Sequence, residues 1–351
     1  MPHIPELIPK HHQFRILFGQ KPLTRFKDYR NSIKVDLIKH DDKEEMMKGT
    51  YDFVKATWSE DGMESSRASH EEMEHALDQM FGGKALGLGL ETINFIFRIS
   101  GITRIDTHQI VRQRIGVTFS QQCTGDRFLS HNDALVEECI AQDPMLLQGF
   151  IDATLATKMS YAQMNDSFKV SIQAARTITP HNLETFIFMK IDLSTLLFFY
   201  KKRIDDGSQT WEINEIARKM QEAVCAVFPE MESIFAKMKG SFDFQKKASA
   251  DRTNLLSTNL YIPKDDEFDY HHRDFLYPMK KEQMNFTNTP IKDLFYWGTT
   301  QVTEDQFNAI KTLYDKHDAD VKANHYSNEE IKERAEAINE HFTQFLAAYN
   351  S

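Results

Sequence analysis

Two segments with the hydrophobic pattern of buried strands constrain the fold of this chain most. In residues 92–100 large apolar side chains occupy every second position, which is typical of a strand that packs one face on a core. The apolar face carries Ile93, Phe95, Phe97 and Ile99. Residues 183–191 contain the apolar run Phe186 to Met189, which indicates a second buried strand. Helix signals surround both segments. The pattern therefore predicts an α/β or α+β fold, in which a core sheet is flanked by long helices.

The helix signals are caps followed by apolar residues at helical spacing. Asp41 or Asp42 can cap a helix that runs to about Trp58, and Ser69 with Glu72 forms a capping box before a helix that ends at Gly82. Further helices are expected over 103–114, 168–177, 193–201 and 211–228, and another runs from there to about residue 238. Two more helices are expected over 131–165, with a division near residue 144.

Three parts follow from these patterns. Residues 1–34 contain several prolines and little periodicity, and we expect an extended N-terminal arm. Residues 35–240 hold the predicted sheet and its helices and form the main domain. Residues 241–351 are expected to be a C-terminal extension, loop-rich to about 300 and then helical over 303–317 and 328–349, where two capping boxes open the helices. Such an extension is expected to wrap the core or to meet another subunit.

Composition excludes several classes of protein. The formal net charge of −10 argues against binding to duplex nucleic acid, because neutralising phosphates needs a basic face. No apolar run approaches the ~18 residues of a membrane helix, and residues 1–12 lack a signal-peptide core. The three scattered cysteines suggest neither a disulfide framework nor a zinc site. We expect a cytoplasmic protein without a metal, a membrane or a duplex nucleic acid as partner.

Polar side chains concentrate between residues 107 and 128. Gln109, Arg112 and Arg114 are expected to project together from a helix end, and Gly125 and Arg127 to follow in a loop. Guanidinium groups bind phosphates and carboxylates bidentately, and a glutamine amide can read the edge of a pyrimidine. One side of this segment is expected to be buried by Ile105, Ile110, Val111, Ile115 and Val117. These residues suggest an anionic, nucleotide-sized ligand site, or else only a helix with a charged solvent face.

The same segment resembles the signature of flavin-dependent thymidylate synthases. That family typically carries Gln-x-x-Arg-His-Arg, then seven residues, a Ser, and Gly/Gln-Arg-Tyr. This chain has Gln109-Ile-Val-Arg112-Gln113-Arg114, then Gln122-Cys123, then Gly125-Asp126-Arg127-Phe128. When these motif residues are aligned, Gln113 stands where the family has His, and Gln122 or Cys123 stands where it has Ser. The loop of this chain is about three residues longer than that of the family.

A second stretch supports the resemblance. Residues 175–185 look like the family's Ala-Arg-x-x-x-Pro-x-Asn-Leu-x-Thr, and the likeness continues to Arg203 and Asp205. Gln209 and Trp211-Glu212-Ile213 are similar to the family's Gln-Trp-Glu-Ile, with one residue inserted. Glu91 with Phe95 and Phe97 resembles a family strand. The likeness covers roughly residues 35 to 240.

The resemblance implies a reaction and its partners. The reaction would be the reductive C5 methylation of dUMP to dTMP, with FAD as cofactor and with methylenetetrahydrofolate and NADPH as co-substrates. The active form would be a homotetramer whose sites are built from several chains. Two alternatives remain: a divergent relative that modifies another pyrimidine nucleotide, for example by hydroxymethylation or on a ribonucleotide, or a nucleotide-binding protein that has lost catalysis.

The resemblance also assigns residues. Arg176 and Arg203 would polarise the pyrimidine ring. The chemistry of a thiol, rather than the resemblance, gives Cys123 two roles: its thiolate would add to C6 of uracil, or the residue would only pack. The substrate set implied is Gln109, Gln121, Gln122, Cys123, Gly125, Arg127, Arg176 and Arg203. The cofactor set implied is Arg112, Gln113, Arg114, Asp192, Ser194 and Phe198. The last three depart from the family's Asn, Arg and Asn, so flavin binding is expected to be weaker than is usual for the family.

Overall fold

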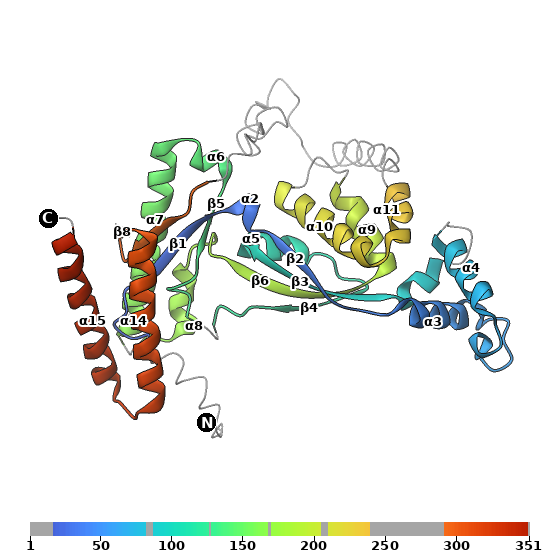
Figure 1. The fold of residues 1–351 in the computed structure, drawn as a ribbon, viewed down its shortest axis with the longest axis horizontal. Helices are drawn as coiled ribbons and strands as arrows, with labels where there is room; N and C mark the ends of the chain where they lie inside the picture. Colours follow the sequence, from blue (N-terminus) through green and yellow to red (C-terminus); the bar gives the residue numbers. More distant parts are fainter. Residues whose placement is uncertain are drawn as a thin grey trace, which may run out of the picture.

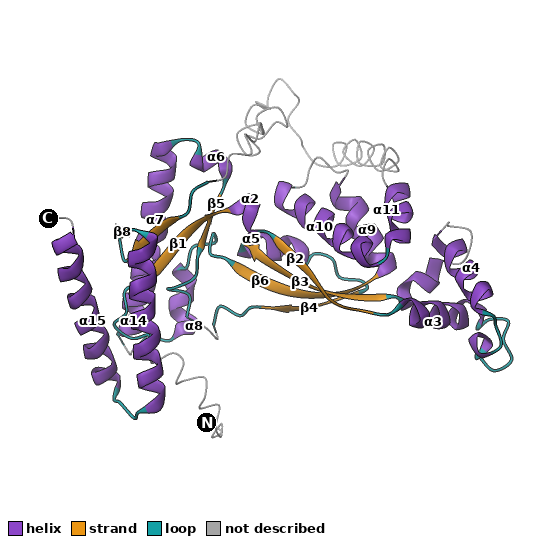
Figure 2. Ribbon diagram, in the orientation of Figure 1, coloured by secondary structure: helices purple, strands orange, loops and turns teal. Residues whose placement is uncertain are grey.

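The computed structural model describes residues 17–81, 87–125, 128–167, 170–204, 210–238 and 291–349. Within these ranges the chain forms two four-stranded sheets with helices packed against them (Figures 1 and 2). The mixed α/β class predicted from the sequence is confirmed.

The central sheet has the strand order β2-β3-β6-β4 and is antiparallel throughout. Its strands are β2 (Lys34–His40), β3 (Asn94–Ile102), β6 (Thr185–Asp192) and β4 (Val117–Gln121). Phe97 of β3 is paired with Leu37 on one side and Met189 on the other. The alternation seen in the sequence therefore places one set of side chains on a buried face, because successive residues of a strand point to opposite sides.

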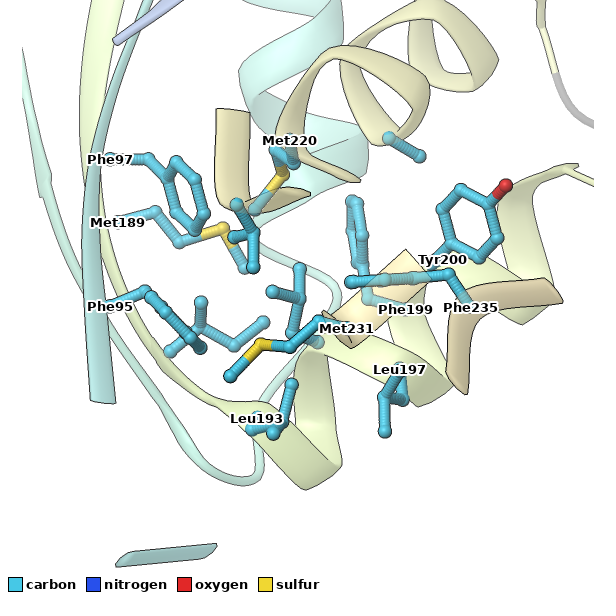
Figure 3. Close-up of a cluster of buried hydrophobic side chains, with 14 of the residues drawn as sticks. Phe95, Phe97, Met189, Leu193, Leu197, Phe199, Tyr200, Met220, Met231 and Phe235 are labelled. Atoms are coloured by element: carbon cyan, nitrogen blue, oxygen red, sulfur yellow. The ribbon is translucent and has the colours of Figure 1, made fainter. Parts of the chain in front are cut away.

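Helices cover that buried face (Figure 1). They are α9 (Leu193–Ile204), α10 (Trp211–Val227) and α11 (Glu232–Met238), and α5 (Arg104–Ile110) lies beside them. Phe95, Phe97, Met189 and Met220 are fully buried, and Figure 3 shows them packed with side chains of α9 and α11. Burial of each such side chain contributes about 1.5–3 kcal/mol, so this core dominates the stability of the main domain.

The second sheet joins the two ends of the chain. Its order is β5-β1-β7-β8, formed by β5 (Ala134–Val136), β1 (Leu23–Asp28), β7 (Leu294–Trp297) and β8 (Thr300–Val302). β1 runs parallel to β5 and antiparallel to β7, with Phe26 paired to both Ala134 and Leu294. The extended arm predicted over residues 1–34 is therefore corrected: residues 23–32 form β1 and helix α2 (Tyr29–Ser32). Their partners are remote in sequence, and no local pattern shows them.

The C-terminal helices pack on this second sheet. In Figure 1, α14 (Glu304–Ala323) lies beside β1 and β8, and α15 (Asn328–Tyr349) lies on the outer side of α14. Leu23, Trp297, Tyr314 and Phe342 form a buried cluster between them. The long helix α7 (Pro144–Asp166) contributes to a further cluster around Phe26. The arm and the extension thus share one sheet and one core.

Other predicted elements agree with the structure in outline. The remaining helices are α3 (Lys43–Lys55), α4 (His70–Phe81), α6 (Glu138–Ala141) and α8 (Ile172–Ala175), with the short 3-10 turns η1 (Glu64–Ser66), η2 (Gly87–Thr92), η3 (Arg176–Ile178) and η4 (Pro229–Met231). Asp42 and Glu45 form both hydrogen bonds of a capping box, as do Thr303 and Gln306. None of the helices in these ranges is long and apolar enough to cross a membrane.

The segment after α5 differs from the expectation. The helix predicted over 103–114 ends at Ile110, and residues 117–121 form strand β4 instead of a loop. Gly116 has φ +69°, a left-handed conformation that a helix excludes, and it starts the strand. Ile105 and Ile115, expected to be buried, are 54% and 81% exposed. Over 168–177 the described part is reduced to α8 and the short turn η3.

Candidate functional site

A cavity of about 290 Å³ lies where α5, the end of β4, the turn η3 and the start of β6 meet. Arg104, in the first turn of α5, donates from Nη1 to the Gln122 carbonyl oxygen at 3.0 Å. This bond ties the helix to the end of β4. Thr107 and Gln121 form a second tie between the same two elements. The walls are Arg104, His108, Gln122, Thr124, Leu129, Asn132, Arg176, Thr177, Thr179, Pro180, His181, Leu183, Glu184 and Thr185.

The polar lining of this cavity suits an anion. Two guanidinium groups, Arg104 and Arg176, face it together with His108 and His181. The carboxylate of Glu184 is the acidic group of the lining, and it is paired with Lys27 at 2.7 Å. Small-molecule sites combine such convergent polar groups with apolar walls, and about 290 Å³ lies at the lower end of their size range.

Two of the predicted substrate residues line the cavity. These are Gln122, just after β4, and Arg176, which opens η3. Arg104, His108 and His181 also line it, and the sequence reasoning missed them. Arg104 and His108 are four residues apart on α5, so their shared helical face was a signal that the sequence carried.

Arg203 of α9 and Gln109 of α5 are not part of the cavity lining. Arg203 is 7% exposed, and its Nη2 donates to the Gln109 carbonyl oxygen at 3.3 Å. Its guanidinium carbon lies 5.2 Å from the ring centroid of Phe199. Arg203 is therefore a buried guanidinium in the last turn of α9. Its direct contact with a nucleotide stays a prediction.

Cys123 and Gly125 lie in the turn that follows β4. The Cys123 side chain is exposed, and its sulfur accepts a hydrogen bond from the Gly125 amide at 3.3 Å. Gly125 is buried, and a Cβ there would lie 2.3 Å from Nε2 of Gln173. A larger residue there would therefore require the Gln173 side chain to move. Arg127, which belongs to the predicted substrate set, lies outside the described residues.

The two halves of the predicted cofactor set lie next to each other. The Asp192 amide donates to the Gly116 carbonyl oxygen at 3.2 Å, so the turn after α5 abuts the start of α9. Arg112 and Arg114 in this turn are exposed, and Phe198 on α9 is 45% exposed. Two exposed guanidinium groups fit a diphosphate in charge. Gln113 and Ser194, both half-buried, belong to the same two segments.

Asp192 has a structural task in this chain. It is buried, and its oxygens accept hydrogen bonds from the Thr195 amide at 2.7 Å and the Thr195 hydroxyl at 2.9 Å. It therefore caps the first turn of α9. Its predicted contact with a cofactor remains untested, and the structure gives its carboxylate another function.

Residues 36–230 match the family model described as "Thymidylate synthase complementing protein". This is more than half of the chain. The chain belongs to this family.

Named relatives agree with the match. The flavin-dependent thymidylate synthase of Pyrococcus furiosus is 31% identical over 171 residues, which is 47% of this chain and 67% of that protein. That of Pyrococcus abyssi is 33% identical over 153 residues, 40% of this chain and 60% of the relative. That of Thermococcus kodakarensis is 28% identical over 201 residues, 55% and 79% of the two chains. The resemblance drawn from the sequence motifs is confirmed, and the relatives are one-carbon transferases.

Two solved structures show a more distant likeness. The UMP/dUMP methylase PolB from Streptomyces cacaoi, bound with 5-Br dUMP, aligns with a TM-score of 0.48 and 14% identity, covering 60% of this chain and 97% of that one. The flavin-dependent thymidylate synthase ThyX from Helicobacter pylori, complexed with FAD and dUMP, aligns with a TM-score of 0.41 and 13% identity, covering 54% and 93%.

A buried carboxyl group belongs to the first turn of α5, within the family-matched region. Asp106 is 2% exposed and accepts hydrogen bonds from the Tyr29 hydroxyl and from the amide and hydroxyl of Thr103. Burial raises the pKa of Asp106 to about 6. The hydrogen bonds from Thr103 close the capping box that starts the helix carrying Arg104 and His108.

A second carboxyl group connects α6 to α10. Glu137 accepts a hydrogen bond from Nε1 of Trp211 at 3.1 Å. Burial, together with the nearby charge of Glu212, raises the pKa of Glu137 to about 9, so this carboxyl is protonated at neutral pH.

Proposed function

We propose that this chain is a flavin-dependent thymidylate synthase-like enzyme, which methylates dUMP at C5 to give dTMP. Methylenetetrahydrofolate would supply the carbon and NADPH the reducing equivalents. The observation that carries the proposal is the cavity of Arg104, His108, Gln122 and Arg176, which lies inside the family-matched residues 36–230. Two arginines in one partly enclosed cavity match the charge of a nucleotide monophosphate.

The cavity residues would have different roles in binding the nucleotide, according to their chemistry. Arg104 and Arg176 would hold the phosphate and stabilise negative charge that develops on the pyrimidine. The Gln122 amide offers a donor and an acceptor to the pyrimidine edge. Arg203 would act through Gln109, by holding α5 in place.

FAD would lie on the neighbouring surface formed by the turn after α5 and the start of α9. Arg112 and Arg114 would neutralise its diphosphate, and the exposed ring of Phe198 would pack against it. When bound, the flavin supplies the redox chemistry, and the protein positions it. Gln113 and Asp192 would contribute little to FAD binding, because the side chain of each already forms a hydrogen bond to a nearby residue.

Assembly into a homotetramer in the cytoplasm completes the proposal. No helix among the described residues covers the outer face of the central sheet, where Phe186 and Phe188 are half-buried and Lys190 is exposed (Figure 1). A second chain there would bury apolar surface. Light scattering should then give a mass of several chains, and a monomer at all concentrations would contradict the shared-site assembly.

Cys123 supports a second candidate, the modification of another pyrimidine nucleotide. Cys123 is exposed, and its neighbours in the sequence, Gln122 and Thr124, line the cavity, although Cys123 itself does not. A thiolate at this place could add to C6 of a pyrimidine. Hydroxymethylation or action on a ribonucleotide would fit the same cavity, and a protein that only binds nucleotides is the remaining alternative.

One set of titrations separates these candidates. The purified protein should bind FAD, recognisable by visible flavin absorbance, and then bind dUMP by calorimetry. Mass spectrometry of the nucleotide after incubation with methylenetetrahydrofolate and NADPH should show dTMP. A product from UMP, or a hydroxymethylated base, would favour the second candidate. Binding of dUMP without flavin or turnover would favour the non-catalytic one.

A further inference from the structure

The loop His131–Asp133 is where the cavity meets the ends of the chain. Asn132 lines the cavity, and its Nδ2 donates to the Glu184 carbonyl oxygen at 3.1 Å. The Glu184 amide donates back to the Asp133 carbonyl oxygen at 2.9 Å. Since Glu184 also lines the cavity, a shift of this loop moves two residues of its wall.

His131 joins the loop to the N-terminal segment. Its Nδ1 accepts a hydrogen bond from the Leu23 amide at 2.9 Å, so the ring proton resides on Nε2. Nε2 then donates to Oε1 of Gln20 at 3.1 Å. Burial lowers the pKa of His131 to about 3, so this neutral tautomer persists across the physiological range.

Gln20 continues the connection to the C-terminal extension. It is 3% exposed, and its Nε2 donates to Oδ1 of Asp318 at 2.9 Å and lies 3.3 Å from Nδ1 of His317. Both acceptors belong to α14. His317 in turn reaches the Ile331 carbonyl oxygen of α15 through its Nε2 at 3.2 Å. A continuous chain of hydrogen bonds therefore runs from α15 to the loop.

The other side of the loop is fixed as well. The buried Lys158 of α7 donates to the Asn132 carbonyl oxygen and to the Thr24 hydroxyl, both at 2.6 Å. The carboxylate of Asp133 accepts from Arg25 at 2.7 Å. These bonds hold the loop from α7 and β1, and the bond from His131 to Gln20 adds the connection to α14.

We propose that the C-terminal extension is a positioning element for the cavity, and that Gln20 and His131 transmit the position of α14 to Asn132 and Glu184. Gln20, α14 and α15 lie outside the family-matched residues 36–230, so this control belongs to this chain rather than to the matched domain. The proposal rests on the proposed function only for the choice of dUMP as the probe. Coupling between sites through such packed hydrogen-bond chains is usually modest but measurable.

The test compares four full-length variants: two that break the hydrogen-bond chain and two controls. Gln20→Leu removes the amide contacts with His131, His317 and Asp318 at similar volume, and Asp318→Leu removes one of the two acceptors on α14. Each should raise the Kd for dUMP about fivefold to tenfold. Asp318→Asn keeps an oxygen acceptor and should bind as the parent does. In turnover the nucleotide KM should rise while kcat and the affinity for FAD stay constant, because the cofactor residues lie elsewhere.

Asp166→Ala is the matched control. Asp166 accepts a hydrogen bond from the Gly19 amide at 2.9 Å, so its loss loosens the same N-terminal segment without touching the loop. It should leave dUMP binding near that of the parent. Equal Kd values for Gln20→Leu, Asp318→Leu and Asp166→Ala would overturn the proposal.

Amide hydrogen exchange tests the coupling between α14 and the loop 131–133 without any ligand. The amides of Asn132 and Glu184, which donate to the Leu129 and Asp133 carbonyl oxygens, should exchange faster in Gln20→Leu than in Asp166→Ala. If the parent binds no pyrimidine nucleotide, the proposed function fails, but faster exchange at these two amides would still support the positioning role. Unchanged exchange there would refute it.

Discussion

Arg203 and Gln109 are joined across two helices, since Nη2 of Arg203 donates to the Gln109 carbonyl oxygen at 3.3 Å. Gln109 directly follows His108, which lines the cavity. The buried guanidinium therefore connects the last turn of α9 to the helix that carries part of the cavity wall.

Arg203→Ala should weaken dUMP binding by about 1.5–3 kcal/mol, the range for a hydrogen bond that involves a charged group. Arg203→Lys should recover part of the loss, because an ammonium lacks the planar fork. Lys202→Ala, an exposed position in the same turn, should bind as the parent does. Calorimetric titration measures all three, and parent-like binding by Arg203→Ala would contradict a role for this residue.

Arg112→Ala and Arg114→Ala should each weaken FAD binding about tenfold or more, because each removes a charge from the surface proposed for the diphosphate. Flavin fluorescence on titration gives the affinities. Arg218→Ala changes an exposed arginine of α10 that is paired with Glu215, and it should have no effect. Loss of affinity in all three variants alike would point to a general charge effect instead.

Glu137→Gln should flatten the pH dependence of stability. A glutamate in water has an ordinary pKa of 4.5, whereas the pKa of Glu137 in the folded chain is raised to about 9. Between these values the folded chain binds more protons than the unfolded one, so the free energy of unfolding falls as the pH rises. The amide does not titrate and can still accept from Trp211.

The measurement is urea denaturation at pH 6 and pH 9, a window inside the range from 4.5 to about 9. The stability advantage of Glu137→Gln over the parent should grow with pH. Glu222→Gln, at an exposed position of α10, should show no such trend. An advantage that is the same at both pH values would show that Glu137 does not titrate in this window.

Gly101→Ala should destabilise the chain by about 2 kcal/mol or more, because the residue has φ +68° and a Cβ would lie 1.8 Å from the Ser32 carbonyl oxygen. Gly49→Ala, in the middle of α3 with open space around it, should instead stabilise by about 0.5–1 kcal/mol. Thermal denaturation compares the two. A neutral Gly101→Ala would mean that the backbone near Ser32 can move at low cost.

The elements that depend on local patterns could be read from the sequence. The alternation at β3 and the apolar run at β6 predicted the central strands, because one side of a strand must be buried. Helices α9, α10 and α15 followed from apolar spacing, and α3 and α14 from their caps. The order of the two sequence motifs along the chain also indicated the family, and the match of the family model over residues 36–230 confirmed it.

The tertiary structure alone decided which of these elements meet. β1 pairs with β7 across most of the length of the chain, and the buried bond between Gln20 and α14 spans a similar separation. The cavity likewise combines Arg104, Arg176 and Asn132 from three separate segments. Local propensity fixes the conformation of a segment, but its partner depends on which surfaces exclude water together in the whole chain, and no sequence window contains that information.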